Sequence, residues 1–259
     1  MEKPGAIFDP IKHDSVSDAV LNQIETMIVN GILKEGTRLP SEREMSELME
    51  VSRPKLREAL KQLEDSGLVQ VKHGEGSFIA KLTGAALAPA FLDLYARHPL
   101  AFYDYLEYRR EQEGFAARLA AERATETDKE IIRSLLERMD SAHEAEDSEA
   151  AQEADIDFHA AIVDASCNST LIHMMASIYD LTKRGVFYSR SYLRKQESAA
   201  AKLLEQHHVI ADAIFRGEPE QAEAAAKAHI DYVETSFRVG EARRERERVA
   251  EKRKVLWGA

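Results

Sequence analysis

Four side chains in the second half of the chain have the types and the spacing to bind a metal ion. Asp155 and His159 are four residues apart, so on a helix they share one face, with Cβ atoms about 5–6 Å apart. His207 and His229 each lie eleven residues from Glu218, at which we expect a turn between two antiparallel helices. Residues equally distant from such a turn lie at the same height, and side chains from facing helices can meet inside a bundle.

Three imidazoles and one carboxylate suit a divalent metal ion, Zn²⁺ first, with Ni²⁺, Mn²⁺ or Fe²⁺ as alternatives. Two neighbouring side chains compete for these roles. Asp157 is only two residues from His159, on the wrong side of the helix, and His208 is rotated by about 100° from His207. Because His207 shares the side of Ile210 and Ile214, we expect it to point inward. An ordinary surface or core histidine is the alternative for each position.

A second group of side chains could contact DNA. Its members lie at the N-terminal end of a predicted helix, in the helix before it, or at the tip of a predicted hairpin: Ser52, Arg53, Lys55, Arg57, Arg43, His73 and Gly74. An arginine can donate two hydrogen bonds to a guanine, and a helix N-terminus with a hydroxyl suits a phosphate. The alternative is that these charges form a solvated surface.

The elements that position this second group occupy the first 80 residues. Apolar residues at three- and four-residue spacing predict helices, and Ser41 with Glu44 forms a capping box. After Gly67 the period changes to two, which indicates a hairpin. The predicted elements are a helix from Val16 to Ile28 closed by Asn30-Gly31, a short helix from the cap Ser41 through Met49, a helix from the cap Ser52 to Ser66, and strands at 68–71 and 78–79.

From residue 85 onward the apolar period is helical throughout, with short breaks. We predict helices over 86–96, 99–124, 127–146, 148–166, 169–187, 196–216 and 219–250. Caps are expected at Thr125, at Thr127-Asp128 and at Asn168. Short loops predict an antiparallel bundle in which sequential helices are neighbours. The fold class is therefore mainly α, with a winged helix-turn-helix at 1–80, a linker at 81–86, an all-helical domain at 87–240 and a charged tail at 241–259.

Composition limits the classes of function. The chain has 259 residues and a single cysteine, Cys167, which excludes a disulfide framework and a cysteine-based zinc module. We expect a cytoplasmic protein that does not span a membrane.

The charge of the chain is distributed unevenly. The net charge of −11 argues against a nucleic-acid partner, yet residues 51–81 carry a net charge of +2 and residues 241–254 a net charge of +3. One segment can therefore face phosphates. The basic tail is either a solvated helix extension, or a dimer or DNA contact.

A family resemblance fits this layout. The run GILKEGTRLPSEREMSELMEVSRPKLREALKQLEDSGLV at 31–69 resembles the DNA-binding domain of the GntR superfamily of bacterial transcription regulators, apart from Met45, where leucine is usual. The resemblance implies that Arg43, Ser52, Arg53 and Arg57 contact DNA, and that the hairpin tip enters the minor groove. Lys55 lies at a position that varies in that family, where it could tune base preference.

Residues 99–240 resemble the all-helical ligand domain of the FadR-type branch. The motifs are LEYRREQEGF, DIDFHAAIVDASCN and HHVIADAIFRGEPEQAEAAAKAHI. In metal-binding members these motifs supply ligands at the positions of Asp155, His159, His207 and His229. The resemblance also implies that Arg109 lines an effector cavity. The alternatives for that cation are an exposed ion pair with Glu113 and, for an effector contact, the neighbouring Arg110, which we expect to face water.

The sequence therefore predicts a homodimeric transcription regulator, a repressor, that reads a short palindromic operator in double-stranded DNA. Its effector is expected to be a small α-hydroxy or α-keto carboxylate, such as glycolate, lactate or pyruvate, bound at the metal. Two alternatives are a metal-dependent enzyme that acts on a small carboxylate and a regulator that responds to an acyl-CoA thioester.

Overall fold

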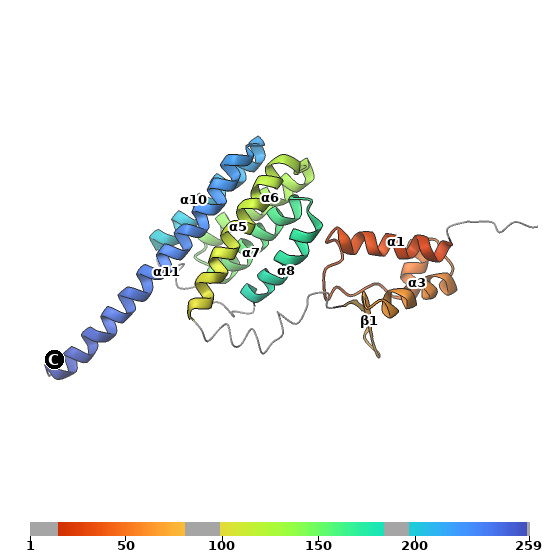
Figure 1. Cartoon of the computed structure of the whole chain (residues 1–259), viewed down its shortest axis with the longest axis horizontal. Coiled ribbons are helices and arrows are strands. Elements are labelled where there is room, and N and C mark those ends of the chain that lie inside the picture. Colours follow the sequence, from red (N-terminus) through yellow and green to blue (C-terminus); the bar gives the residue numbers. More distant parts are fainter. Residues whose placement is uncertain (1–14, 81–98, 184–196, 258–259) are drawn as a thin grey trace, which may run out of the picture. The chain divides into compact units, whose positions relative to one another are not determined.

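A computed structural model describes residues 15–80, 99–183 and 197–257 (Figure 1). Contacts divide the chain into two units, Met1–Leu82 and Thr83–Ala259, each with a hydrophobic core of its own. The expected linker at 81–86, the expected helix at 86–96 and the end of the expected helix at 169–187 lie outside the described residues.

The first unit is the predicted winged helix-turn-helix. It consists of α1 (Val16–Val29), α2 (Glu42–Leu48), α3 (Arg53–Asp65), β1 (Val69–Lys72) and β2 (Gly76–Ile79). Reciprocal hydrogen bonds between Ser15 and Asp18 and between Ser41 and Glu44 form capping boxes, which satisfy backbone donors at the starts of α1 and α2. The strands pair antiparallel, with Val69 opposite Ile79.

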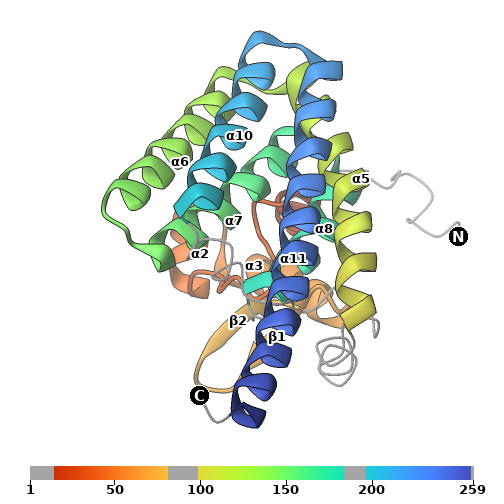
Figure 2. The same cartoon turned by 90° about the vertical axis from the view of Figure 1, so that its left-hand side faces the viewer.

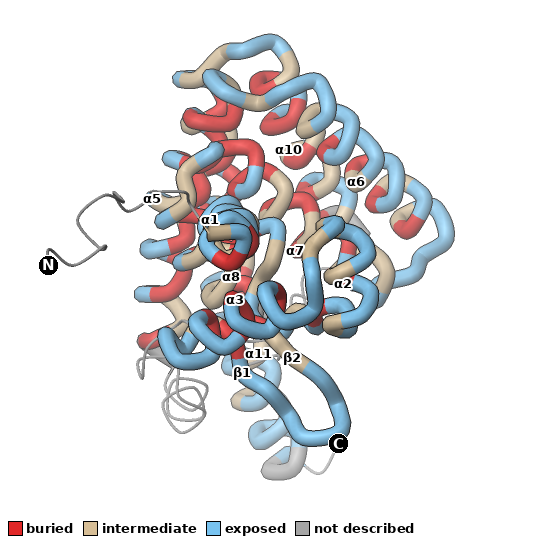
Figure 3. The backbone as a smooth tube through the Cα atoms, turned by 90° about the vertical axis from the view of Figure 1, so that its right-hand side faces the viewer, coloured by how far each residue is buried: buried red, intermediate tan, exposed pale blue. Residues whose placement is uncertain are grey.

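The core of this unit combines apolar side chains from all three helices and the hairpin. Ile24 of α1 packs with Leu56 and Leu63 of α3, and each is at most 1% exposed. Val16 departs from the predicted stripe, because half of it is exposed. The neighbouring Ser17 is inaccessible instead, so the buried face of α1 passes through Ser17, Val20, Ile24 and Ile28. The hairpin tip is exposed (Figure 3).

The second unit is the predicted antiparallel helical bundle. Its described helices are α5 (Pro99–Arg123), α6 (Glu126–Glu144), α7 (Ser148–Ala165), α8 (Ser169–Lys183), α10 (Glu197–Arg216) and α11 (Pro219–Leu256). Gly217, with a φ of +66°, makes the break between α10 and α11. Within this unit α11 runs well past the ends of the other helices (Figure 1).

Only some of the helices that follow one another in the sequence also pack against each other. The pairs α6–α7, α7–α8 and α10–α11 pack against each other as expected, but α5 packs chiefly against α11 and α7 rather than against α6 (Figure 2). The reason is that α5 has a wide buried face: the adjacent residues Ala116 and Ala117, about 100° apart around the helix, are both inaccessible. A face of this width can contact more than one neighbouring helix.

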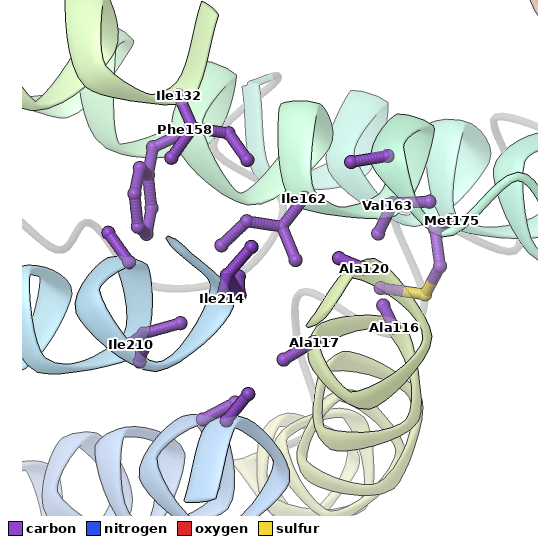
Figure 4. Packing of buried hydrophobic residues seen from close by; sticks show 14 of the residues in the cluster. Ala116, Ala117, Ala120, Ile132, Phe158, Ile162, Val163, Met175, Ile210 and Ile214 are labelled. Carbon is purple, nitrogen blue, oxygen red and sulfur yellow. The ribbon is translucent and has the colours of Figure 1, made fainter. Parts of the chain in front are cut away.

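The core of the bundle is built from facing α7, α10 and α5. Ile162 and Phe158 of α7 meet Ile214 of α10, while alanines of α5 lie on the third side (Figure 4). Small alanine side chains such as Ala117 let α5 approach its neighbours closely. This packing fixes the inner faces of the three helices.

Caps begin two of the helices that surround this core. Thr125 and Asp128 form a capping box at α6, so Thr127, which was also expected to cap, lies inside the first turn. Asn168 caps α8 by accepting a hydrogen bond from the backbone of Leu171 at 3.2 Å. Among the described helices none has the length and apolar character that crossing a membrane requires.

Candidate metal centre and DNA interface

The four predicted metal ligands converge in the interior of the bundle. α7 carries Asp155 and His159, α10 carries His207 and α11 carries His229. All four are at most 4% exposed. One potential donor atom from each lies within 4.8 Å of the others, so the geometry expected from the spacing is present. Their role as ligands stays a prediction.

The distances between donor atoms fit a divalent ion. Nε2 of His207 lies 3.1 Å from Oδ1 of Asp155 and 3.3 Å from Nε2 of His159, and Nε2 of His159 lies 3.9 Å from that Oδ1. With metal–nitrogen bonds of about 2.1 Å, adjacent ligands of an octahedral ion lie about 3.0 Å apart and opposite ligands about 4.2 Å. A small movement of the four donor atoms toward a common centre brings their separations to these values. Nitrogen and carboxylate donors of this kind suit Zn²⁺ and its neighbours.

Two of the imidazoles have polar partners on the side away from the centre. Nδ1 of His229 is hydrogen-bonded to Oε1 of Gln206 at 3.1 Å. Nδ1 of His159 lies 3.0 Å from Oε2 of Glu113, a carboxylate on α5 that is 4% exposed. Gln206 and Glu113 thus contact the imidazoles from outside the group of four donor atoms.

The competing side chains point elsewhere. Asp157 forms an ion pair with Arg138 at 3.6 Å, on the outside of α7. His208 lies 2.9 Å from Asp140 of α6 and its side chain is 44% exposed. His207 is therefore the inward histidine, as the side shared with Ile210 and Ile214 predicts.

Arg109 is buried beside the metal centre. Its Nε and one terminal nitrogen each lie 2.6 Å from Oε1 of Glu113, and the rings of Tyr105 and Tyr179 lie 5.6 and 5.9 Å from the guanidinium carbon. Burial acts against the charge, but Glu113 and the two tyrosines outweigh it and raise the pKa of Arg109. Burial, with Glu113 adding to it, raises the pKa of Tyr179 well above its usual value.

The ion pair expected as the alternative for Arg109 is thus present, but it is buried rather than exposed. Neighbouring helices pack against the pair on two sides, since Tyr179 of α8 lies beside Arg109 and His159 of α7 lies beside Glu113. Arg110 is one-third exposed and pairs with Asp231 at 2.7 Å, which agrees with the expectation that it faces water.

Two cavities adjoin the centre. The inner one, between Glu113 and His159, has a volume of about 10 Å³, room for about one water molecule. The outer one has a volume of about 500 Å³ and runs between α6, α10 and the start of α7, where His207 contributes to its wall. Glu144, Glu146 and Asp147 also line it.

The predicted DNA contacts are all exposed on the first unit. Ser52 precedes α3, and its hydroxyl does not cap the helix. Arg53, Lys55 and Arg57 follow in the first turns. His73 and Gly74 form the hairpin tip together with Glu75, and Gly74 adopts a φ of +79°, which favours glycine.

Acidic side chains accompany three of these cations. Arg43 pairs with Glu47 at 3.6 Å, Lys55 with Glu58 at 2.8 Å, and Arg57 with Glu42 of α2 at 2.6 Å, the last through two of its nitrogens. The hydrogen bond lowers the pKa of Glu42 and raises that of Arg57. The pair ties the start of α3 to the start of α2.

Comparison with known proteins assigns the two units. Residues 16–79 match "Bacterial regulatory proteins, gntR family", and residues 104–232 match the FCD domain. The chain is 34% identical over 227 residues to the "Putative L-lactate dehydrogenase operon regulatory protein" of Escherichia coli K12, with 86% of each chain covered. This protein belongs to the GntR family.

Other GntR relatives agree with that assignment. The "HTH-type transcriptional regulator LutR" of Bacillus subtilis is 35% identical over 80% of this chain and 94% of its own length. The "Glc operon transcriptional activator" of Escherichia coli K12 is 33% identical, with 86% and 89% covered. A solved Streptococcus agalactiae GntR structure has the same fold, with a TM-score of 0.53 and 22% identity over 85% of this chain and all of that one.

This GntR-family chain is therefore a DNA-binding transcription regulator and not an enzyme. The prediction of a regulator is confirmed, and the alternative of a metal-dependent enzyme is wrong, because the family and the relatives are regulators.

Sequence reasoning missed the partners on the outer sides of the imidazoles. The sequence predicts Glu113 only as an exposed partner of Arg109, and it predicts no role for Gln206 or Tyr179. The signal for Glu113 is its spacing: it lies four residues from Arg109 and seven from Leu106, on one helix face.

Proposed function

We propose that this regulator senses a small carboxylate, an α-hydroxy or α-keto acid, at a divalent metal ion held by Asp155, His159, His207 and His229. The observation that carries the proposal is the convergence of one carboxylate and three imidazoles in a buried site. The name of the Escherichia coli relative, a regulator of an L-lactate dehydrogenase operon, supports an acid of this class.

The metal, when bound, supplies the positive charge and the open coordination positions that attract a carboxylate. Asp155, His159, His207 and His229 would hold the ion, and an ion that accepts more than four donors would have room for both oxygens of a hydroxy or keto acid. The inner cavity holds about one water molecule, so an acid must move neighbouring side chains when it enters. That movement would couple the effector to the packing of α7, α10 and α11.

The outer cavity is the proposed entrance. His207 forms part of its wall, and acidic residues, Glu144 and Glu146 among them, also line it. Such an acidic wall repels an anion, so a carboxylate would enter only if a cation, here the proposed metal ion at His207, attracted it. The same wall disfavours the acyl-CoA alternative, because the thioester's phosphates carry several negative charges.

The proposed DNA contacts are the exposed group on α2, α3 and the hairpin: Arg43, Ser52, Arg53, Lys55, Arg57, His73 and Gly74. The N-terminal end of α3 carries cations suited to base edges in the major groove, and the hairpin tip is free of bulky side chains at Gly74. We propose that two copies bind a palindrome as a homodimer in the cytoplasm, and that the acid releases a repressor from its operator.

The test compares metal content, operator affinity and response to acid. The operator is selected from a random double-stranded library, and L-lactate, glycolate and pyruvate serve as probes. His207→Ala is expected to reduce bound metal at least ten-fold and to abolish the effect of acid on operator affinity. Operator binding without acid should survive, because α3 lies in the other unit. Metal is measured by mass spectrometry and affinity by fluorescence anisotropy.

His208→Ala is the matched control, since it removes a neighbouring imidazole that faces outward. It should keep the wild-type metal content and acid response. Equal metal content in the two variants would refute the ligand assignment. Tighter binding to the operator in the presence of acid would refute repression by release, and sedimentation as a monomer on DNA would refute the dimer.

A further inference from the structure

The buried side chain of Glu113 contacts both Arg109 and the proposed metal ligand His159. One carboxylate oxygen lies 2.6 Å from Arg109, and the other lies 3.0 Å from Nδ1 of His159. All three side chains are at most 4% exposed. Glu113 and Arg109 come from α5, whereas the four proposed ligands come from α7, α10 and α11.

The position of this carboxylate has a consequence for His159. A neutral imidazole carries its proton on one nitrogen only, and an acceptor next to Nδ1 keeps the proton there. Nε2 then keeps its lone pair, which a metal ion requires. Nε2 of His159 is the nitrogen that faces Nε2 of His207, at 3.3 Å.

His229 shows the same arrangement with a different partner. Oε1 of Gln206 accepts from the Nδ1 side at 3.1 Å, and the rings of His207 and His229 lie 4.5 Å apart between centroids. His229 therefore has a hydrogen-bonded oxygen acceptor at Nδ1, and His159 has a carboxylate oxygen 3.0 Å from its Nδ1. Such outer partners fix the orientation of ligating histidines and raise their affinity for metal.

We propose that Glu113 is a positioning residue for metal binding: held in place by Arg109, it fixes the Nδ1–H tautomer of His159 and so directs Nε2 to the ion. The inference rests on the proposed metal site and adds a residue outside the four ligands. Arg109 is the counter-charge of this buried carboxylate, so it is not needed when position 113 carries a neutral acceptor.

The variants must avoid leaving a buried charge alone, which by itself destabilises a protein strongly. Arg109→Met combined with Glu113→Leu removes both charges and the acceptor. Arg109→Met combined with Glu113→Gln removes both charges but keeps an oxygen acceptor at position 113. The two double variants therefore differ in the acceptor at Nδ1 of His159. Glu111→Gln, on the exposed side of α5, is the control.

The first measurement is the Zn²⁺ dissociation constant, by competition with a chelator. We expect the Met/Leu variant to bind Zn²⁺ about 10–100-fold more weakly than wild type, and the Met/Gln variant and Glu111→Gln to stay within about three-fold. The second is the ring ¹⁵N spectrum of His159 in metal-free protein at pH 8. Wild type and Met/Gln should show the Nδ1–H tautomer, and Met/Leu a mixture of both.

Equal Zn²⁺ affinity in the two double variants, both folded by circular dichroism, would overturn the proposal. If the Met/Leu variant does not fold, the ring ¹⁵N spectrum of the wild-type protein still tests the proposal. An Nε2–H tautomer at His159 in metal-free wild type would contradict it. Failure of the metal site itself is a separate result: wild type would then bind no Zn²⁺, whatever the tautomer of His159.

Discussion

His207 and His208 are adjacent in the sequence, yet only the first faces the interior of the bundle. One residue step rotates a side chain by about 100° around a helix, which places His207 among buried apolar groups and His208 beside Asp140 on the surface. The same rotation separates Arg109, buried with Glu113, from Arg110, which pairs with Asp231 near solvent. At this scale chemistry depends on the helix face as much as on residue type.

Arg57 allows a test at the residue scale in the DNA-binding unit. Replacement by Ala removes a cation from the start of α3 and leaves the Glu42 carboxylate facing the phosphates. We expect operator affinity to fall at least about five-fold, since a good arginine contact contributes about 1–3 kcal/mol. Anisotropy titrations at one fixed salt concentration measure the change, because binding to DNA is strongly salt-dependent.

The matched control for this experiment is Arg216→Ala, which breaks another exposed arginine–glutamate pair, with Glu218 at 3.0 Å. It lies in the bundle and should leave operator affinity unchanged. Comparable losses in both variants would show that Arg57 has no special part in DNA binding.

At the scale of single elements, caps decide where helices begin. The capping boxes at Ser15, Ser41 and Thr125 each satisfy backbone donors that would otherwise lack a partner in the first turn. α11 differs from these helices because it extends beyond its packing partners. Tyr103 of α5 donates a hydrogen bond of 2.5 Å to Glu241 of α11, and residues 241–254 are mostly exposed. The helical, exposed segment agrees with a solvated helix extension, and its contact with a partner chain or with DNA stays a prediction.

Thr125 tests the importance of a cap for α6. Thr125→Ala removes the side-chain oxygen that accepts from the backbone of Asp128 and should lower the free energy of unfolding by about 1 kcal/mol. Thr127→Ala, two residues further into the same helix, should be neutral or slightly stabilising, because alanine is the better helix former. Urea unfolding of the bundle, followed by circular dichroism, measures both. A larger loss for Thr127→Ala would contradict the assigned cap.

At the scale of the whole molecule, charge is distributed unevenly. The chain carries a net charge of −11, which would repel DNA if it were spread over the surface. The predicted DNA contacts instead bring together four exposed cations on α2 and α3 of the first unit. The two units have separate hydrophobic cores, so a substitution in one core leaves the apolar contacts of the other in place.

Metal addition should therefore stabilise the bundle measurably. Zn²⁺ at a hundred-fold excess over its dissociation constant adds about 2.7 kcal/mol to the stability of the state that binds it. For a unit of this size the Tm should rise by about 5–10 °C, and a chelator should reverse the rise. Differential scanning calorimetry measures the shift. An equal rise in the His207→Ala protein would mean that Zn²⁺ stabilises it at some other place.

Much of the molecule is determined by the sequence itself, because the period of 3.6 residues per turn is a property of the backbone. Asp155 and His159 share a face for that reason, and His207 and His229 meet because both are equally distant from the turn at Glu218. The caps at Ser41, Thr125 and Asn168 are also local, since each acts within one turn of its own residue.

Tertiary structure alone decided which faces meet and how deeply they are buried. Arg109 and Glu113 were predictable as partners at i and i+4, but their burial depends on Tyr179 of α8, some seventy residues away. The contact of Glu113 with His159 likewise requires α5 to pack beside α7. Such contacts depend on the summed burial of all the helices, a non-local quantity that no short segment of sequence contains.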